Sequence, residues 1–249
     1  MNYNQFSNLS CYEEFEIQCD LTGISKIDVL KEIGHKINDY YFFVSTDGIF
    51  NWFDLKGNNI EDPGSLKKIK EEYIPKNITK CTIPNSVTCI GYGSFFYCMS
   101  LTSITIPNSV ISIIDLAFRH CTSLTSIVIP DSVTRIGFAA FSYCDKLKEI
   151  TIPDSVTSIA DSAFWNCTSL TSITIPDSII DISNYGFCDC KSIKSITIPN
   201  NVTSIGYNAF SGCESLKEVI FKGKTLDEVK QMKYYPFGIE DESIIKCEI

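Results

Sequence analysis

The most reactive side chains that recur regularly in this sequence are the thiols of six cysteines. They are 23 residues apart, at Cys98, Cys121, Cys144, Cys167, Cys190 and Cys213. A structural zinc ion needs four ligands that converge tetrahedrally, whereas residues at a fixed period in a stack of coils form a straight row. Neighbouring members of the row reach disulfide range, but their side chains are parallel and lie among apolar residues, where free cysteine is common. We therefore predict buried free thiols and no metal site.

Two histidines, His35 and His120, are the candidates for acid–base chemistry. Neither has a motif partner, because the sequence contains no nucleophile elbow, no H-E-x-x-H and no phosphate-binding loop. His120 follows Arg119 at an outward repeat position, which favours a solvated surface residue. We therefore predict that the protein is not an enzyme, with no catalytic residues and no cofactor.

Short polar side chains form a second row with the same period. Its members are Asn85, Asn108, Asp131, Asp154, Asp177 and Asn200. A row of side-chain oxygens is conceivable as a calcium site. The mixture of Asn and Asp, each followed by a small polar residue in most copies, instead favours turns that the side chain closes onto the backbone.

These rows belong to a repeat that organises the middle of the chain. Its unit is L-x-x-I-x-I-P-[ND]-S-V-x-x-I-x-x-x-A-F-x-x-C-x-S, and six copies follow in fixed register. The I-x-I pair puts two side chains on one face of a strand, and the proline ends the strand because it lacks a ladder donor. One coil cannot close a core, so the sequence predicts stacked coils whose inward side chains lie on their own equivalents.

The unit resembles the BspA-type leucine-rich repeat, and the resemblance covers about residues 78–222. It implies a parallel β-solenoid of right-handed coils with strands along one face. It also implies adhesins and interaction proteins as relatives, and it brings no catalytic residue set. We therefore predict a β-rich solenoid.

The period divides the chain into three parts. Residues 1–75 lack it and indicate a small α+β module, with a strand over 15–19, a helix over 25–38, a hairpin over 40–55 and a short helix over 65–73. This module is either a cap on the open core or an effector domain of its own.

The solenoid is predicted over residues 76–222, as six repeats after a leading half repeat, and a C-terminal cap over residues 223–249. In that cap, Thr225 and Glu228 have the spacing of a helix N-cap and its capping partner, and the chain is expected to finish as an extended strand.

The net charge and the hydrophobic pattern exclude some classes of binding partner. The sequence has 21 Lys and Arg against 30 Asp and Glu, a net charge of −9, which disfavours nucleic acid. No stretch approaches the roughly 18 apolar residues of a membrane-spanning helix. The first residues have neither a basic nor an apolar signal region, so we expect a cytoplasmic or other reducing compartment, with the cell surface as the alternative.

A binding surface is the remaining functional feature. Two outward rows on the predicted strand face are binding candidates: Ser103, Ser126, Glu149 and Ser172 in one, and Thr105, Val128, Thr151 and Thr174 in the other. Three aromatic residues away from that face, Tyr97, Tyr143 and Trp165, are the preferred hot spots, because buried aromatic anchors dominate many interfaces. Packing between coils is the competing interpretation of these aromatics.

We therefore expect a non-enzymatic protein-binding scaffold that is a monomer and has a protein partner. The first alternative is a surface or virion-type adhesin, which the resemblance supports. The second is an inhibitor or effector that acts through the N-terminal module, where residues 1–75 carry 13 acidic and 7 basic side chains.

Overall fold

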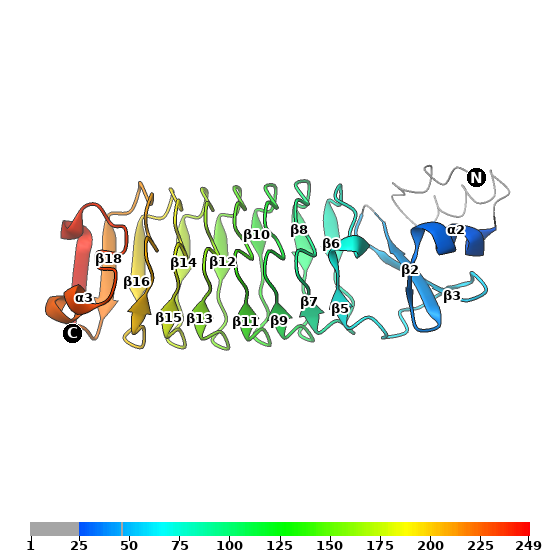
Figure 1. Ribbon diagram of the computed structural model, residues 1–249, viewed down its shortest axis with the longest axis horizontal. Coiled ribbons are helices and arrows are strands. Elements are labelled where there is room, and N and C mark those ends of the chain that lie inside the picture. The colour runs from blue at the N-terminus through cyan, green and yellow to red at the C-terminus, as the bar shows by residue number, and fades with distance from the viewer. Residues whose placement is uncertain (1–24, 46) are drawn as a thin grey trace.

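The computed structural model describes residues 25–45 and 47–249. In this part of the chain, stacked coils form a long parallel solenoid with a small antiparallel sheet at its N-terminal end (Figure 1). A helix and a final strand lie at the C-terminal end. The β-solenoid predicted from the 23-residue period is confirmed.

The L-x-x-I-x-I segment of each repeat forms a strand on one side of the solenoid. Within a pair the register is one repeat, as in Ile127 with Ile150 and Ile150 with Ile173. The strands of this series are β6 (Lys80–Thr82), β8 (Ser103–Thr105), β10 (Ser126–Ile127), β12 (Glu149–Thr151), β14 (Ser172–Thr174), β16 (Ser195–Ile198) and β18 (Glu218–Lys222).

The V-x-x-I segment forms a second, shorter strand in each coil. Pairing is again parallel and one repeat apart, as in Ile90 with Ile113. This series consists of β5 (Lys68–Ile69), β7 (Cys89–Ile90), β9 (Ser112–Ile113), β11 (Arg135–Ile136), β13 (Ser158–Ile159), β15 (Asp181–Ile182) and β17 (Ser204–Ile205).

A column of phenylalanines runs through the core along the third side of the coils. From Phe95 to Phe210, consecutive repeat phenylalanines are stacked with ring centroids 5.1–5.9 Å apart and interplanar angles of 1–12°. All six rings are buried. Each coil therefore supplies one ring to a continuous apolar column that no single coil could bury.

The N-terminal module begins with α2 (Lys26–Ile33), followed by an antiparallel sheet of order β1 (His35–Ile37), β2 (Tyr40–Val44), β3 (Phe50–Asp54) and β4 (Asn59–Ile60). The predicted hairpin is confirmed as β2 and β3, with Val44 opposite Phe50. The strand predicted over 15–19 lies outside the described residues.

The helix predicted over 25–38 is wrong in its second half, because α2 ends before Gly34. The Gly34 N–H donates to the Leu30 carbonyl, and a Cβ at Gly34 would lie 2.6 Å from that oxygen. The chain then turns into β1, which pairs with β2 over His35–Ile37. Pairing in the sheet thus outweighs the helical spacing of the apolar residues.

The helix predicted over 65–73 is also wrong. The structure has β5 and a short 3-10 helix, η2 (Glu71–Tyr73), in its place. Ile69 pairs with Ile90 of β7, so this segment is already part of the first coil, before the expected start of the solenoid at residue 76.

At the C-terminal end, α3 (Leu226–Gln231) starts at Thr225 with the predicted capping box: the Thr225 side chain accepts from the Glu228 N–H, and the Glu228 carboxylate accepts from the Thr225 N–H. A 3-10 helix, η3 (Glu242–Ile244), follows. The final strand, expected over residues 239–249, is confirmed only over β19 (Ile245–Glu248), which follows η3 and pairs in parallel with β18.

Candidate interaction surface

The two candidate rows on the strand face lie where the sequence places them. Ser126, Glu149 and Ser172 are in register on three neighbouring strands, and Thr151 is in register with Thr174. All eight candidates of these rows are exposed, and Val128 is the most open of the apolar side chains there at 79%. The rows therefore present a surface of small side chains, interrupted by the single carboxylate of Glu149.

The aromatic candidates are brought together along the edge of the solenoid that precedes the repeat cysteines. Tyr97 stacks on His120 with ring centroids 4.4 Å apart and planes 6° apart, and His120 stacks on Tyr143 at 4.5 Å and 19°. Trp165 continues the row at 5.2 Å from Tyr143, and Phe96 packs edge-on against Tyr97 at 4.5 Å. We call these five residues the aromatic ladder.

Three members of the ladder occupy equivalent backbone positions, which aligns their rings. Tyr97, His120 and Tyr143 each directly precede a repeat cysteine and have φ of 59°, 62° and 60°. Their N–H groups donate to carbonyls of the next coil at 2.8–3.0 Å, as Tyr143 does to Trp165. The rings consequently repeat at roughly the 4.7–4.9 Å spacing of neighbouring strands.

Hydrogen bonding fixes the far end of the ladder. The Trp165 Nε1–H donates to the Asp189 carboxylate at 3.0 Å, and the Cys188 thiol contacts the same oxygen at 3.5 Å. The indole is half-buried, while Tyr97 at the other end is 47% exposed. The ladder is thus both packed between coils and open to solvent, which combines the two interpretations of these aromatics.

Burial and the neighbouring Arg119 lower the pKa of the histidine in the ladder. Burial lowers the pKa of His120, the Arg119 guanidinium lowers it further, and Asp145 opposes both. That guanidinium lies 5.6 Å from the Tyr143 ring centroid, and its buried Nε has no hydrogen-bond partner among the described residues. Burial also raises the pKa of Asp145, although a hydrogen bond from Asn166 lowers it. His120 is therefore a half-buried ring of the ladder, stacked between two tyrosines as well as reaching the surface where we expected it.

His35 lies in the N-terminal module and does not meet His120. Its ring packs 5.3 Å from Phe42 and 4.7 Å from Tyr73. Burial lowers its pKa, Glu72 raises it, and Lys70 lowers it. The arrangement is that of a ring in an aromatic cluster, and the structure brings no nucleophile to either histidine within the residues it describes.

The repeat cysteines are free and point into the coils. From Cys121 to Cys213, each thiol donates to the carbonyl of a phenylalanine in the preceding coil at 3.1–3.3 Å, as Cys144 does to Phe118. Burial raises the pKa of each thiol, to about 12 for Cys167 and well above its usual value for Cys144. Sequence reasoning placed these thiols inside but missed the bond between coils; the only signal for it is a phenylalanine 26 residues before each of these cysteines.

The Asn and Asp row differs from the expected turn capping, because the neighbouring serine makes the bond. The hydroxyls of Ser109, Ser132 and Ser178 each donate at 2.7 Å to a carbonyl of the preceding coil. Asp131, Asp154 and Asp177 are exposed. In the described part of the chain, no group of three or more His, Cys, Asp or Glu side chains could hold a metal ion.

A parallel solenoid built from leucine- and isoleucine-containing repeats, with strands along one face, is the architecture of a leucine-rich repeat protein. A family model described as the BspA type leucine rich repeat region matches residues 67–191 and 111–238, in six copies. The chain belongs to this family.

Two proteins of known structure are among those similar to this chain. A leucine rich cell surface protein from Faecalibacterium prausnitzii is 33% identical with a TM-score of 0.59, and the match covers 76% of this chain and 54% of that one. The chain thus spans about half the length of that protein. A leucine rich repeat protein from T. pallidum is 26% identical with a TM-score of 0.60, over 72% of this chain and 88% of that one.

The known relatives of this chain define a repeat family and no specific activity. A search of the curated proteins gives no match. The family is a repeat scaffold, and no catalytic family is indicated. Within residues 25–45 and 47–249, none of the helices has the length and apolar character that crossing a membrane requires.

Proposed function

We propose that this protein is a non-enzymatic scaffold that binds another protein through the aromatic ladder. The supporting observation is that Tyr97, Tyr143 and Trp165, named from the sequence as hot spots, lie in one row that is held by backbone bonds and still reaches solvent. Aromatic rings whose positions are fixed before binding lose little conformational entropy in a complex.

The repeat itself supplies substitutions that test this proposal without disturbing the coil. Asn166 adopts the same left-handed backbone as the ladder tyrosines, with φ of 59°, so Tyr97→Asn and Tyr143→Asn suit their positions. Serine occupies the equivalent position of Trp165 in a neighbouring coil, at Ser142, which makes Trp165→Ser the third change.

The ladder variant with all three changes is compared with the native chain in capture from native lysate, with bound proteins identified by mass spectrometry. We expect a loss of at least about 30-fold in the captured partner, because a hot spot contributes about 2 kcal/mol or more. The matched control carries Val128→Thr and Glu149→Ser, which are also residues of neighbouring repeats. If only the control loses the partner, the strand face is the binding surface.

A cell-surface adhesin is the second candidate, and one observation favours it: the similar Faecalibacterium prausnitzii protein is described as a cell surface protein. The buried thiols with their S–H donors instead support a reducing compartment. Treatment of intact source cells with a membrane-impermeant amine label separates the two. Labelled lysines on the solenoid would support the surface location, and unlabelled protein in cells whose surface proteins are labelled would contradict it.

We propose that the N-terminal module serves as a cap and not as an effector. Phe42 and Trp52 belong to the same buried cluster as the repeat core, and Phe42 packs 5.0 Å edge-on against Tyr73. The exposed acids Glu32 and Asp39 provide the test by reversal to lysine. Unchanged capture supports a cap, whereas loss of the partner with the fold intact assigns binding to the module.

A further inference from the structure

The last repeat is less covered than the others. In each earlier coil the Phe-x-x-Cys-x-x-Leu turn is packed under the next coil, and the side chains of Cys190 and Ile193 are buried. Their equivalents in the last repeat, Cys213 and Leu216, are only half-buried. The turn that would cover them is therefore missing in part.

The segment after α3 supplies one backbone bond of the absent coil. The Phe210 N–H donates to the Phe237 carbonyl at 3.0 Å, as each earlier repeat phenylalanine donates to the residue before the phenylalanine of the following coil, and Phe237 is buried. No Cys-x-x-Leu turn follows Phe237; the chain passes through Gly238 into η3. This leaves a cavity of about 200 Å³ between the last repeat and residues 238–244.

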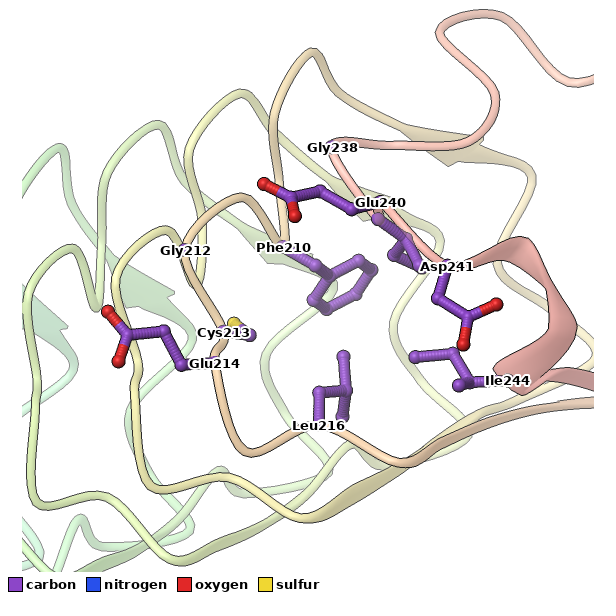
Figure 2. Close-up of a pocket in the computed structure, with 10 residues that line it drawn as sticks. Phe210, Gly212, Cys213, Glu214, Leu216, Gly238, Glu240, Asp241 and Ile244 are labelled. Carbon is purple, nitrogen blue, oxygen red and sulfur yellow. The ribbon is translucent and has the colours of Figure 1, made fainter.

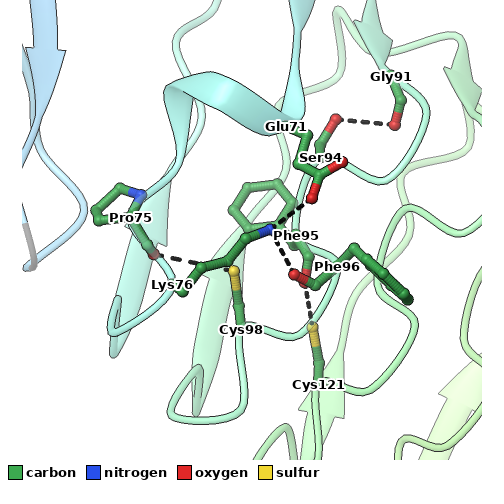
Figure 3. Close-up of polar contacts among 9 residues, drawn as sticks. All are labelled: Glu71, Pro75, Lys76, Gly91, Ser94, Phe95, Phe96, Cys98 and Cys121. Carbon is green, nitrogen blue, oxygen red and sulfur yellow. Dashed lines mark hydrogen bonds and ion pairs between the residues drawn. The ribbon is translucent and has the colours of Figure 1, made fainter.

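At the N-terminal end of the solenoid, described residues cover the equivalent turn. There the Cys98 thiol is buried and faces the Pro75 carbonyl at 3.9 Å, and Lys76 bridges the Glu71 carboxylate at 3.0 Å and the Phe96 carbonyl at 2.6 Å (Figure 3). The first repeat cysteine, Cys98, is thus fully covered, whereas Cys213 at the C-terminal end is only half-buried beside the cavity.

The floor of the cavity is apolar and its rim is acidic. Phe210, Leu216 and Ile244 form the floor, and the side chains of Glu214, Glu240 and Asp241 surround it (Figure 2). Ile239 also lines the cavity. All three acids are exposed. A space of this size suits one long side chain, since a cavity of about 150 Å³ already holds benzene.

The three carboxylates are not equally engaged. Glu214 pairs with Lys191 at 2.7 Å, which shows that a cation is accommodated at this rim. The Asp241 carboxylate accepts from the Ser243 N–H at 3.0 Å. Glu240 has no hydrogen bond or ion pair with any residue that the structure describes, so its charge is available to a partner.

We propose that this cavity binds one lysine or arginine side chain of a partner protein. Such a side chain lays its alkyl stem on an apolar surface and keeps its charged end in water, which matches an apolar floor under an acidic rim. An anionic side chain is repelled by the same carboxylates, and a neutral one leaves them without a counter-charge. The site is separate from the aromatic ladder, and the proposal does not depend on the ladder's role.

The probe is the tripeptide acetyl-Gly-Arg-Gly-amide, titrated into the full chain labelled with ¹³C at isoleucine and leucine methyl groups. We expect saturable shifts of the Leu216, Ile239 and Ile244 methyl signals, weakened by added salt. The same peptide with norleucine in place of arginine keeps the alkyl stem and should bind more weakly. Glu240→Gln should weaken the arginine peptide by about two- to fivefold, the range of an exposed ion pair.

Glu248→Gln is the matched control, because Glu248 is an exposed acid at the same end that does not line the cavity. Equal binding of the norleucine and arginine peptides, or equal weakening by both variants, would overturn the proposal in favour of apolar or diffuse attraction. An absence of methyl shifts with every peptide would overturn it as well.

Discussion

Each repeat cysteine is a small apolar filler that also joins two coils. Its thiol donates to a phenylalanine carbonyl of the preceding coil, for example from Cys167 to Phe141 at 3.2 Å. A thiolate could not make that bond, and burial opposes its formation. The cysteines are therefore structural. The packing that lets each thiol bond to the neighbouring coil also suppresses its ionisation and its reactivity.

We predict that the buried repeat thiols do not react in the native protein. At pH 8 the thiolate fraction of Cys144 is negligible because burial raises its pKa well above 9.0. Ellman's reagent followed by peptide mapping should modify the half-buried Cys89 and leave Cys121, Cys144 and Cys190 unmodified. Unfolding in guanidinium should expose all of them. Modification of Cys144 at the rate of Cys89 without denaturant would contradict the bond between coils.

His120 gives the ladder a dependence on pH. Its folded pKa is below the ordinary value of 6.5, so the unfolded chain takes up the proton first on acidification. The contribution of the neutral ring to stability is therefore present above pH 6.5 and is lost as the pH falls toward the folded pKa.

The measurement is the urea midpoint at pH 7.5 and pH 5.5 for the native chain and for His120→Asn, a residue that Asn166 shows to suit this backbone. We expect a smaller difference between the two pH values in the variant. His35 also titrates with a lowered pKa, but it is present in both proteins and cancels. An unchanged difference would mean that His120 is not linked to folding.

At the scale of elements, the period predicts what repeats and fails where the chain does not repeat. The strands on both sides of the solenoid follow from alternating apolar residues at fixed spacing. The segments over 25–38 and 65–73 have helical spacing, but pairing of β1 with β2 ends the first helix at Ile33, and pairing of β5 with β7 replaces the start of the second. Local spacing contains no information about such partners.

The ladder was predictable in part. Tyr97, His120 and Tyr143 are 23 residues apart, so their alignment is visible in the sequence. The stacking of their rings depends on the left-handed backbone at each position. The sequence does not predict that conformation, because left-handed backbone is expected at glycine and these residues are not glycine.

The helix α3 depends on its capping box. Thr225→Ala removes the acceptor for the Glu228 N–H and should cost about 1 kcal/mol of local helix stability. Because α3 lies at the end of the solenoid, we expect faster amide exchange at Val229 and little change at Val133 in a central coil. Thr203→Ala, in a neighbouring coil, is the control. Equal exchange at Val229 in native and Thr225→Ala proteins would show that packing alone holds the helix.

At the scale of the whole molecule, the solenoid is a one-dimensional stack whose interior coils touch only their two neighbours. Its ends are consequently distinct from its middle: aromatic packing covers the N-terminal end, and the C-terminal end retains a cavity over Cys213 and Leu216. The middle is uniform, and the phenylalanine column links its coils without interruption.

Interrupting the phenylalanine column in a central coil should allow the two halves of the solenoid to unfold independently. Phe141 is buried between Phe118 at 5.3 Å and Phe164 at 5.7 Å, and Phe141→Ala should cost about 3–5 kcal/mol. Both coil interfaces at that position weaken, so urea unfolding should change from one transition to two.

The chain offers its own probes and control for that experiment. Its two tryptophans, Trp52 and Trp165, stand on opposite sides of Phe141 and report on the two halves in single-tryptophan variants. Phe138→Ala removes an exposed ring of the same coil and should change the free energy of unfolding by less than about 0.5 kcal/mol. Coincident transitions at both tryptophans in the Phe141→Ala protein would mean that coupling between coils is stronger than the stacking column alone provides.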